Sequence, residues 1–191
     1  MQKNYGMGNA RKAKNDEFYT GWAEIEQEMN AYLDFNPDTF RGKTVLLPCD
    51  DPEWSNFTKY FSLRFMDLGV HKLISTSYAP KSNMNGLFYS PQQSLFDYPQ
   101  YDDKKDFELG KKFVLERKNI NGDGKINIDD LEWEYLRGNG DFRSDEVTKL
   151  RDCSDIVITN PPFSLFREFF SWVMRGGGRI FYYWKYECID I

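Results

Sequence analysis

Residues 154–163 read Ser154-Asp155-Ile156-Val157-Ile158-Thr159-Asn160-Pro161-Pro162-Phe163, and this stretch decides the fold. The apolar run from Ile156 to Thr159 predicts a buried β-strand. Two consecutive prolines must end that strand, because they supply no backbone N–H and fix φ. Open α/β sheets bind ligands just outside the carboxyl ends of their strands, so the turn at 160–163 is a candidate site.

The residue types of this turn suit a flat ring that carries an exocyclic amine. The side-chain oxygen of Asn160 and the carbonyl of Pro161 can each accept one N–H hydrogen bond from the amine, while Pro162 keeps the turn stiff. Two such bonds would draw the nitrogen towards tetrahedral geometry and point its lone pair at an electrophile. Phe163 could stack on a base extruded from a duplex. The alternative is a plain proline turn after a strand, which any α/β protein can contain.

Composition fits an ordinary soluble globular domain. The chain has 191 residues, 40% of them hydrophobic and 29% charged. A formal net charge of −5 argues against a uniformly basic nucleic-acid binder but allows a local basic face. The three cysteines, Cys49, Cys153 and Cys188, form neither a disulfide framework nor a zinc pattern. We therefore expect a cytoplasmic protein with no membrane span, in which the single His71 is structural.

A β-turn-α unit is predicted upstream. Residues 45–47 predict a strand, and residues 54–68 predict a helix with an apolar face. The loop between them, Pro48-Cys49-Asp50-Asp51-Pro52, lacks the glycine pattern of phosphate-cradling loops. Asp50 and Asp51 would repel a pyrophosphate and favour a cation, such as a sulfonium compound, or hydroxyl groups. Alternatively, the two acids are helix N-terminal charges and a cap.

The flanking segments carry further expectations. Residues 1–14 predict a flexible basic arm, and residues 22–33 predict a helix preceded by Phe18, Tyr19 and Thr20. That aromatic-hydroxyl segment could be a helix cap and staple, or could meet a carboxylate-bearing ligand. Residues 72–78 predict a second parallel strand.

Residues 80–136 predict an inserted loop and hairpin region. Residues 80–100 read as loop, and alternating apolar positions between 107 and 118 predict a hairpin. A calcium-type loop follows, with Asn119, Asn121, Asp123 and Asp130 at ligand positions and a predicted helix at 131–136. Asn and Asp replace the usual Asp and Glu at the loop's first and last positions. Asn-Gly and Asp-Gly also form such turns without metal, so we assign no metal and keep calcium as a weak alternative.

The segment 138–146 predicts a turn and a helix capped by Ser144 that runs through Leu150. Asp141 could accept a hydrogen bond from an adenine ring and Phe142 could pack on it; a turn with a cap is the alternative. The last predicted helix covers 163–174.

Four segments, in this order, resemble the EcoRI-type adenine-specific DNA methyltransferase family. They are Lys14-Asn15-Asp16-Glu17-Phe18-Tyr19-Thr20, the 48–52 loop with Ser55-Asn56-Phe57, Gly140-Asp141-Phe142-Arg143-Ser144-Asp145-Glu146, and Thr159-Asn160-Pro161-Pro162-Phe163-Ser164-Leu165-Phe166-Arg167-Glu168. Only the last segment is specific by itself. The resemblance runs from about residue 10 to about residue 181 and is thin between about 80 and 136.

The resemblance implies an α/β fold with a Rossmann-like S-adenosylmethionine-dependent methyltransferase sheet. It also implies methylation of the N6 amine of an adenine flipped out of double-stranded DNA, in a bacterial or phage restriction-modification setting. By position, Phe18, Tyr19 and Thr20 would hold the methionine part of the cofactor, and Cys49, Asp50 and Asp51 would form the cofactor loop. Asp141 and Phe142 would lie by the cofactor's adenine, and residues 160–163 would hold the target base.

The resemblance also implies an incomplete copy. A methyltransferase sheet needs more strands after the Asn-Pro-Pro-Phe strand, and a target-recognition region should follow. Residues 182–188 are unusual for a strand, and a back-translation read one nucleotide later resembles the family's continuation, so we hypothesise a frameshift. Two other functions stay open: methylation of another amine, such as a protein glutamine, and a non-catalytic calcium-binding fragment. Oligomeric state cannot be read from the sequence.

Overall fold

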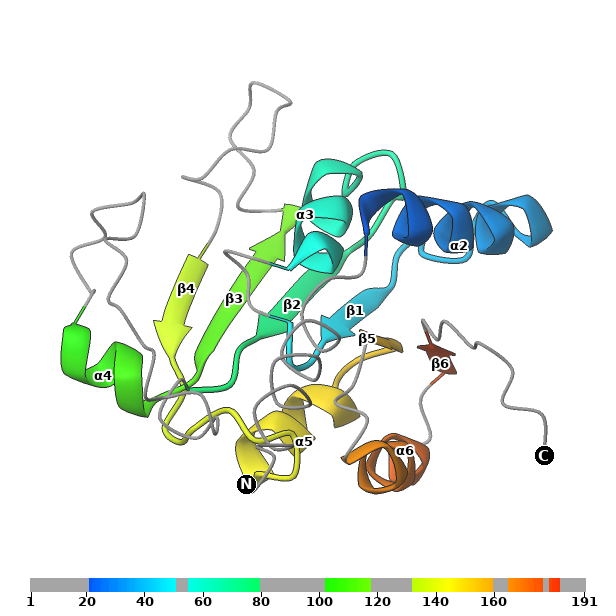
Figure 1. Ribbon diagram of the computed structural model, residues 1–191. Coiled ribbons are helices and arrows are strands. Elements are labelled where there is room, and N and C mark those ends of the chain that lie inside the picture. Colours follow the sequence, from blue (N-terminus) through cyan, green and yellow to red (C-terminus); the bar gives the residue numbers. More distant parts are fainter. Residues whose placement is uncertain are drawn as a thin grey trace, which may run out of the picture.

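The computed structural model describes residues 21–50, 55–79, 102–117, 132–159, 165–176 and 179–182, and these form a mixed α/β fold (Figure 1). Of the sequence-based expectations, the basic arm, the loop at 80–100 and the calcium-type loop lie outside these residues. In the described part the elements follow in the order α2 (Trp22–Phe35), β1 (Thr44–Leu47), α3 (Asn56–Leu63), β2 (Lys72–Thr76), α4 (Asp103–Glu108), β3 (Lys111–Glu116), β4 (Glu132–Tyr135), α5 (Asp145–Asp152), β5 (Ile156–Thr159), α6 (Phe166–Arg175) and β6 (Arg179–Tyr182).

The described strands form one sheet in the order β4-β3-β2-β1-β5-β6. β1 pairs in parallel with β2 on one side and with β5 on the other, and β6 extends the parallel part beyond β5. β3 and β4 complete the other side as antiparallel strands. The expected parallel pairing of the first two strands is therefore confirmed.

Helices cover both faces of the sheet, with α2 and α3 on one face and α5 and α6 on the other (Figure 1). Two hydrophobic cores result. The first joins Ile25 and Met29 of α2 to the aromatic face of α3, and the second joins Val147 of α5 to Phe169 of α6.

The central strands contribute to both cores, which explains why they are uniformly apolar. In β1, Val45 and Leu47 belong to the core under α2 and α3, whereas Leu46 belongs to the core under α5 and α6. In β5, residues 156 and 158 share the first core, and Val157 lies in the second. A strand buried on both faces needs a continuous apolar run, as residues 45–47 and 156–158 provide.

Helix α3 is shorter than the sequence predicts. α3 ends at Leu63, and residues 64–69 form turns that still bury Phe65 and Leu68. Gly69 has φ +66°, a left-handed conformation that a helix cannot contain. α6 is Phe166–Arg175, with Phe169, Trp172 and Val173 as its most buried residues, and the start expected at 163 lies outside the described residues.

Two predictions in the 102–136 region were wrong. Phe107 lies in α4, whose first turn is capped by the Asp102 carboxylate accepting from the Lys104 and Lys105 amides, and not in a strand. Glu132–Tyr135 form strand β4 where a helix was expected over 131–136, because Trp133 pairs across the sheet with Phe113 and stacks on it at 5.8 Å. The helix expected to leave a calcium-binding loop is therefore absent. A third expectation, a hairpin within 107–118, was also wrong: the described part of that range contains one strand, β3, whose antiparallel partner in the main sheet is β4.

None of the helices in the described ranges has the length and apolar character needed to cross a membrane.

Candidate functional site

The carboxyl ends of β1, β2 and β5 lie at the same end of the sheet, where the strands stop and their loops begin. Their registers place Leu47 beside Ser75, while β3 begins and β4 ends at the same edge, where Lys111 pairs with Tyr135. The strand order also reverses here, because the chain fills the sheet from β1 outwards to β4 and then returns to the far side of β1 with β5. The loops that follow β1 and β5 therefore flank a topological switch point.

The loop after β1 is clamped from both neighbouring strands. The Thr159 hydroxyl, at the end of β5, donates a 2.6 Å hydrogen bond to the carbonyl of Pro48. From the other side, the Ser75 hydroxyl of β2 donates to the carbonyl of Asp50 at 2.5 Å. Both hydroxyls are buried, so water cannot replace them. The path of residues 48–50 is thus fixed by side chains of two other strands.

Asp50 connects this loop to the start of α3. The Ser55 hydroxyl donates to the Asp50 carboxylate at 2.8 Å and accepts from the amides of Phe57 and Thr58 as the helix cap. The cap is Ser55, so the alternative in which an acidic residue caps this helix does not hold for Asp50. Asp50 is buried, with 8% of the residue exposed, and places its carboxylate at the carboxyl end of β1.

Cys49 feels the negative charge of two carboxylates, Asp50 and Asp141. Its backbone has φ +68°, an uncommon conformation for a residue with a Cβ, which turns the chain sharply after β1. Burial raises the pKa of the Cys49 thiol, and the negative charges of Asp50 and Asp141 raise it further. The thiol is therefore protonated at neutral pH and is not a nucleophile. Because Asp50 and Asp141 both raise the pKa of Cys49, the loop after β1 and the turn at 138–143 lie near one another.

Two glycines allow that turn to approach the end of β2. A Cβ on Gly140 would lie 2.0 Å from the Ser77 carbonyl oxygen, and one on Gly110 would lie 2.5 Å from the same atom. The Ala79 amide donates to the Asn139 carbonyl at 2.7 Å, which fastens the turn to the chain after β2. Only glycine fits this contact between backbones.

Asp141 is held as a carboxylate by Arg143. The Arg143 guanidinium donates to both Asp141 oxygens, at 2.9 and 2.7 Å, and hydrogen bonds from Arg143 hold the pKa of Asp141 below its usual range. Arg143 also pairs with Glu168 of α6 at 2.6 Å, and the two acids raise its own pKa. This bridge links the turn to the helix that follows residues 160–163. The sequence interpretation missed it, although both residues lie in the quoted segments.

Phe142 is a core residue. Its side chain is 3% exposed and packs edge-on against Phe169 at 5.2 Å and against Trp172 at 5.5 Å. The ring therefore supports the turn from the hydrophobic core. Asp141 is the residue that brings a polar side chain from this turn to the carboxyl ends of the strands.

Of the residues predicted from sequence, the structure describes Cys49, Asp50, Asp141 and Phe142. It brings the first three together at the switch point. The others lie outside the described residues: Phe18, Tyr19, Thr20, Asp51, Asn160, Pro161, Pro162, Phe163 and the calcium candidates Asn119, Asn121, Asp123 and Asp130. β5 ends at Thr159, directly before Asn160. In the described ranges, no group of three or more His, Cys, Asp or Glu side chains could hold a metal ion.

A cationic cofactor fits this edge better than a phosphate-rich one. Asp50 and Asp141 both act on Cys49, and carboxylates favour a cation or hydroxyl and amine donors over a pyrophosphate, although Arg143 already pairs with Asp141. A sulfonium with a hydroxyl-bearing sugar and an exocyclic amine offers charge and donors that match these acceptors.

Comparison with known proteins places this chain in a family. A sequence model described as "Adenine-specific methyltransferase EcoRI" matches residues 6–186, nearly the whole chain. The chain belongs to the EcoRI methylase family. The resemblance inferred from the four segments is thus confirmed.

Relatives of this EcoRI methylase family member carry methyltransferase names. It is 40% identical over 169 residues to the Type II methyltransferase M.EcoRI of Escherichia coli, an alignment that covers 88% of this chain and 45% of the relative. It is 38% identical over 163 residues to the Type II methyltransferase M.MpnI of Mycoplasma pneumoniae, covering 85% of this chain and 38% of the relative. The chain thus spans less than half the length of these relatives. No solved structure matches it.

Proposed function

We propose that this family member uses S-adenosylmethionine to methylate the N6 amine of adenine at a defined sequence in double-stranded DNA, as a bacterial or phage restriction-modification enzyme of the cytoplasm. The observation that carries the proposal is the switch point, where Asp50, Cys49 and Asp141 converge beside the end of β5. We assign the sheet to the Rossmann-like methyltransferase class, because the reversal of strand order at β1 marks the ligand crevice of such sheets.

The proposed cofactor subsite has three parts. The 49–51 loop, with Cys49, Asp50 and Asp51, lies under the sugar and the sulfonium. Asp141 accepts from the exocyclic amine of the cofactor's adenine, while Phe142 holds this turn in place from the core. Phe18, Tyr19 and Thr20 hold the methionine part. When bound, the cofactor supplies an electrophilic methyl group on a positively charged sulfur.

The proposed base subsite follows β5. The Asn160 side-chain oxygen and the Pro161 carbonyl accept the two N6 hydrogens of a flipped adenine, Pro162 stiffens the turn, and Phe163 stacks on the ring. The chain's own contribution is to position the amine against the electrophile and to exclude water. The protonated Cys49 thiol agrees with direct transfer without an enzyme-bound intermediate.

Calorimetric titration with S-adenosylmethionine tests the cofactor subsite. We expect Asp50→Asn and Asp141→Asn to weaken binding by about tenfold or more, because each removes a charge-assisted contact. Asp34→Asn, on the exposed side of α2, is the matched control and should bind like the original chain. If all variants bind S-adenosylmethionine equally, the cofactor binds at another site. If the original chain does not bind it, the proposed cofactor is wrong.

A second measurement tests the substrate. DNA from cells that express the chain is digested with nucleases that are blocked by N6-methyladenine, alongside DNA from cells that express Asn160→Ala. Protection that depends on Asn160 supports adenine in DNA. Labelled methyl groups found on protein and not on DNA would instead support a different amine.

A further inference from the structure

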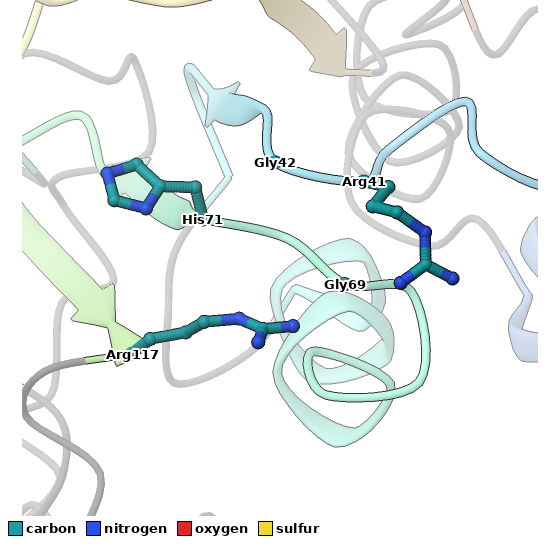
Figure 2. Close-up of a pocket in the computed structure, with 5 residues that line it drawn as sticks. All are labelled: Arg41, Gly42, Gly69, His71 and Arg117. Carbon is teal, nitrogen blue, oxygen red and sulfur yellow. The ribbon is translucent and has the colours of Figure 1, made fainter.

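A pocket lies at the other end of the strands from the candidate site, where β1 and β2 begin. It has a volume of about 260 Å³ and is lined by Arg41, Gly42, Gly69, His71 and Arg117 (Figure 2). The registers place it there, because Thr44 and Lys72 begin β1 and β2 beside Glu116, the last residue of β3. The proposed methyl transfer uses the other ends of these strands and assigns no role to this pocket.

The lining carries positive charge on a rigid backbone. It includes two arginines and a histidine but no carboxylate. The Gly42 amide donates to the Gly69 carbonyl at 2.8 Å, and the His71 amide donates to the Lys43 carbonyl at 2.9 Å. These bonds hold the backbone segments of Arg41 and His71 side by side, while Arg117 follows β3, whose last residue pairs with Lys72 in the sheet. The backbone that carries the three side chains is therefore fixed before any ligand arrives.

Arg117 is oriented towards the pocket without being neutralised. Its Nε donates to the Val70 carbonyl at 3.2 Å, which fixes the plane of the guanidinium and leaves both terminal amino groups as donors. No carboxylate in the described part of the chain pairs with it. Figure 2 shows the guanidinium groups of Arg117 and Arg41 next to the Gly69 segment, with the His71 ring turned away from them.

Arg41 supplies the second group. Its Nε pairs with Asp38 at 2.5 Å, and its terminal nitrogen lies across Gly69, 3.2 Å from where a Cβ would be. Three further acids lie on the neighbouring segments, and each pairs with another cation: Glu116 with Lys72 at 2.6 Å, Asp67 with Arg64 at 3.5 Å and Asp155 with Lys43 at 3.9 Å. Gly42 and Gly69 have φ of +70° and +66°, and a Cβ on Gly42 would point into open space. Gly42 thus leaves its side of the pocket bare, whereas the Arg41 side chain covers Gly69.

We propose that this pocket binds a tetrahedral oxyanion, a phosphate monoester or diester, between the guanidinium groups of Arg117 and Arg41, with His71 at its rim. Arginine forks match the oxygens of phosphate, and this local positive group stands out on a chain of net charge −5. The oxyanion has two possible sources, a backbone phosphate of DNA and a free phosphate compound. This site stands independently of the proposed methyl transfer.

Amide NMR shifts test the proposal. The protein is titrated with inorganic phosphate and, separately, with a short DNA duplex at constant ionic strength. Phosphate should shift the amides of Gly42, Gly69 and His71. Arg117→Gln should weaken that binding about tenfold or more, and Arg117→Lys should weaken it less, because the charge remains. Arg175→Gln is the matched control, since the Arg175 Nε also donates to a backbone carbonyl at 3.2 Å, that of Ser171 on α6.

The outcomes separate cleanly. If the duplex shifts the same amides and phosphate competes with it, the ligand is a DNA phosphate. If phosphate alone shifts them, the ligand is a free phosphate compound. The proposal is overturned if phosphate leaves these amides unmoved, or if Arg117→Gln and Arg175→Gln weaken the shifts equally. Unchanged amide dispersion elsewhere in each variant shows that the fold is intact.

Discussion

The Thr159 hydroxyl donates a 2.6 Å hydrogen bond to the carbonyl oxygen of Pro48, which joins the last residue of β5 to the first residue after β1. Both residues are buried. The bond therefore fixes, in one contact, the relative position of the proposed cofactor loop and of the turn that would hold the base. The switch point depends on this contact more than on any sequence motif by itself.

Thr159→Val should destabilise the fold by about 1–3 kcal/mol, because it leaves the Pro48 carbonyl buried without its donor. Urea unfolding followed by tryptophan fluorescence measures the change. Thr39→Val is the control: the Thr39 hydroxyl donates to the Asn36 carbonyl at the same 2.6 Å but is exposed, so water replaces it and the loss should stay within about 0.5 kcal/mol. Equal losses in the two variants would contradict the role given to burial.

Gly140→Ala should cost about 2–4 kcal/mol of unfolding free energy. The new Cβ would meet the Ser77 carbonyl at 2.0 Å, and φ of +81° is strained for alanine. Gly138→Ala, two residues away, has nothing within 4 Å and should change stability by less than about 0.5 kcal/mol. Thermal unfolding of both variants checks the difference; a tolerated alanine at 140 would mean that the turn can lift away from β2.

Lys111→Met should cost about 3–5 kcal/mol, because it leaves the Asp106 carboxylate buried without its cation. The two side chains are 10% and 8% exposed and lie 2.5 Å apart. Lys43→Met breaks the exposed pair with Asp155 at 3.9 Å and should cost less than about 1 kcal/mol. Chemical denaturation of both variants measures this, and a small effect at Lys111 would show that water reaches the pair.

Arg143→Gln should reduce stability at neutral pH and lose that effect in acid. The arginine holds the pKa of Asp141 below its ordinary value of 3.8, so the stabilisation is present above about pH 4 and disappears as the pH falls through the lowered pKa. The free energy of unfolding is measured for both proteins between neutral and strongly acidic pH. The difference between variant and original chain should disappear at the acidic end. Arg175→Gln removes no carboxylate partner in the described part and should show no such closure; a gap that stays constant with pH would exclude Asp141 as its source.

The sequence predicted the parallel core of the fold well. The runs at 45–47 and 156–158 are apolar and bounded by turn residues, which is typical of a strand buried on both faces. β2 contains only two apolar residues, Leu73 and Ile74, followed by Ser75 and Thr76. The sequence-based prediction failed at β4, where Trp133 and Tyr135 obtain their strand conformation from pairing with β3. Such pairing depends on a distant segment and overrides local preference.

The candidate site was predictable to a similar degree. Cys49, Asp50 and Asp141 stand directly after a predicted strand or in a predicted turn, so their residue types and positions were informative. Thr159, Ser75 and Arg143 were missed as clamps, because each acts through a partner far away in sequence or on another element. Hydrogen bonds of this kind leave no local pattern.

The pairing of β1 with β5 also sets the order in which the molecule can form. The two strands are neighbours in the sheet, yet Thr44 and Asp155 exchange their hydrogen bonds across 111 positions of the chain. During synthesis β1 must wait, with one edge open, until β5 has emerged, and contacts between such distant segments fold slowly. An open apolar edge is also a template for association with other chains. The proposed cofactor site therefore depends on a contact that can form only after residue 159 has been synthesised.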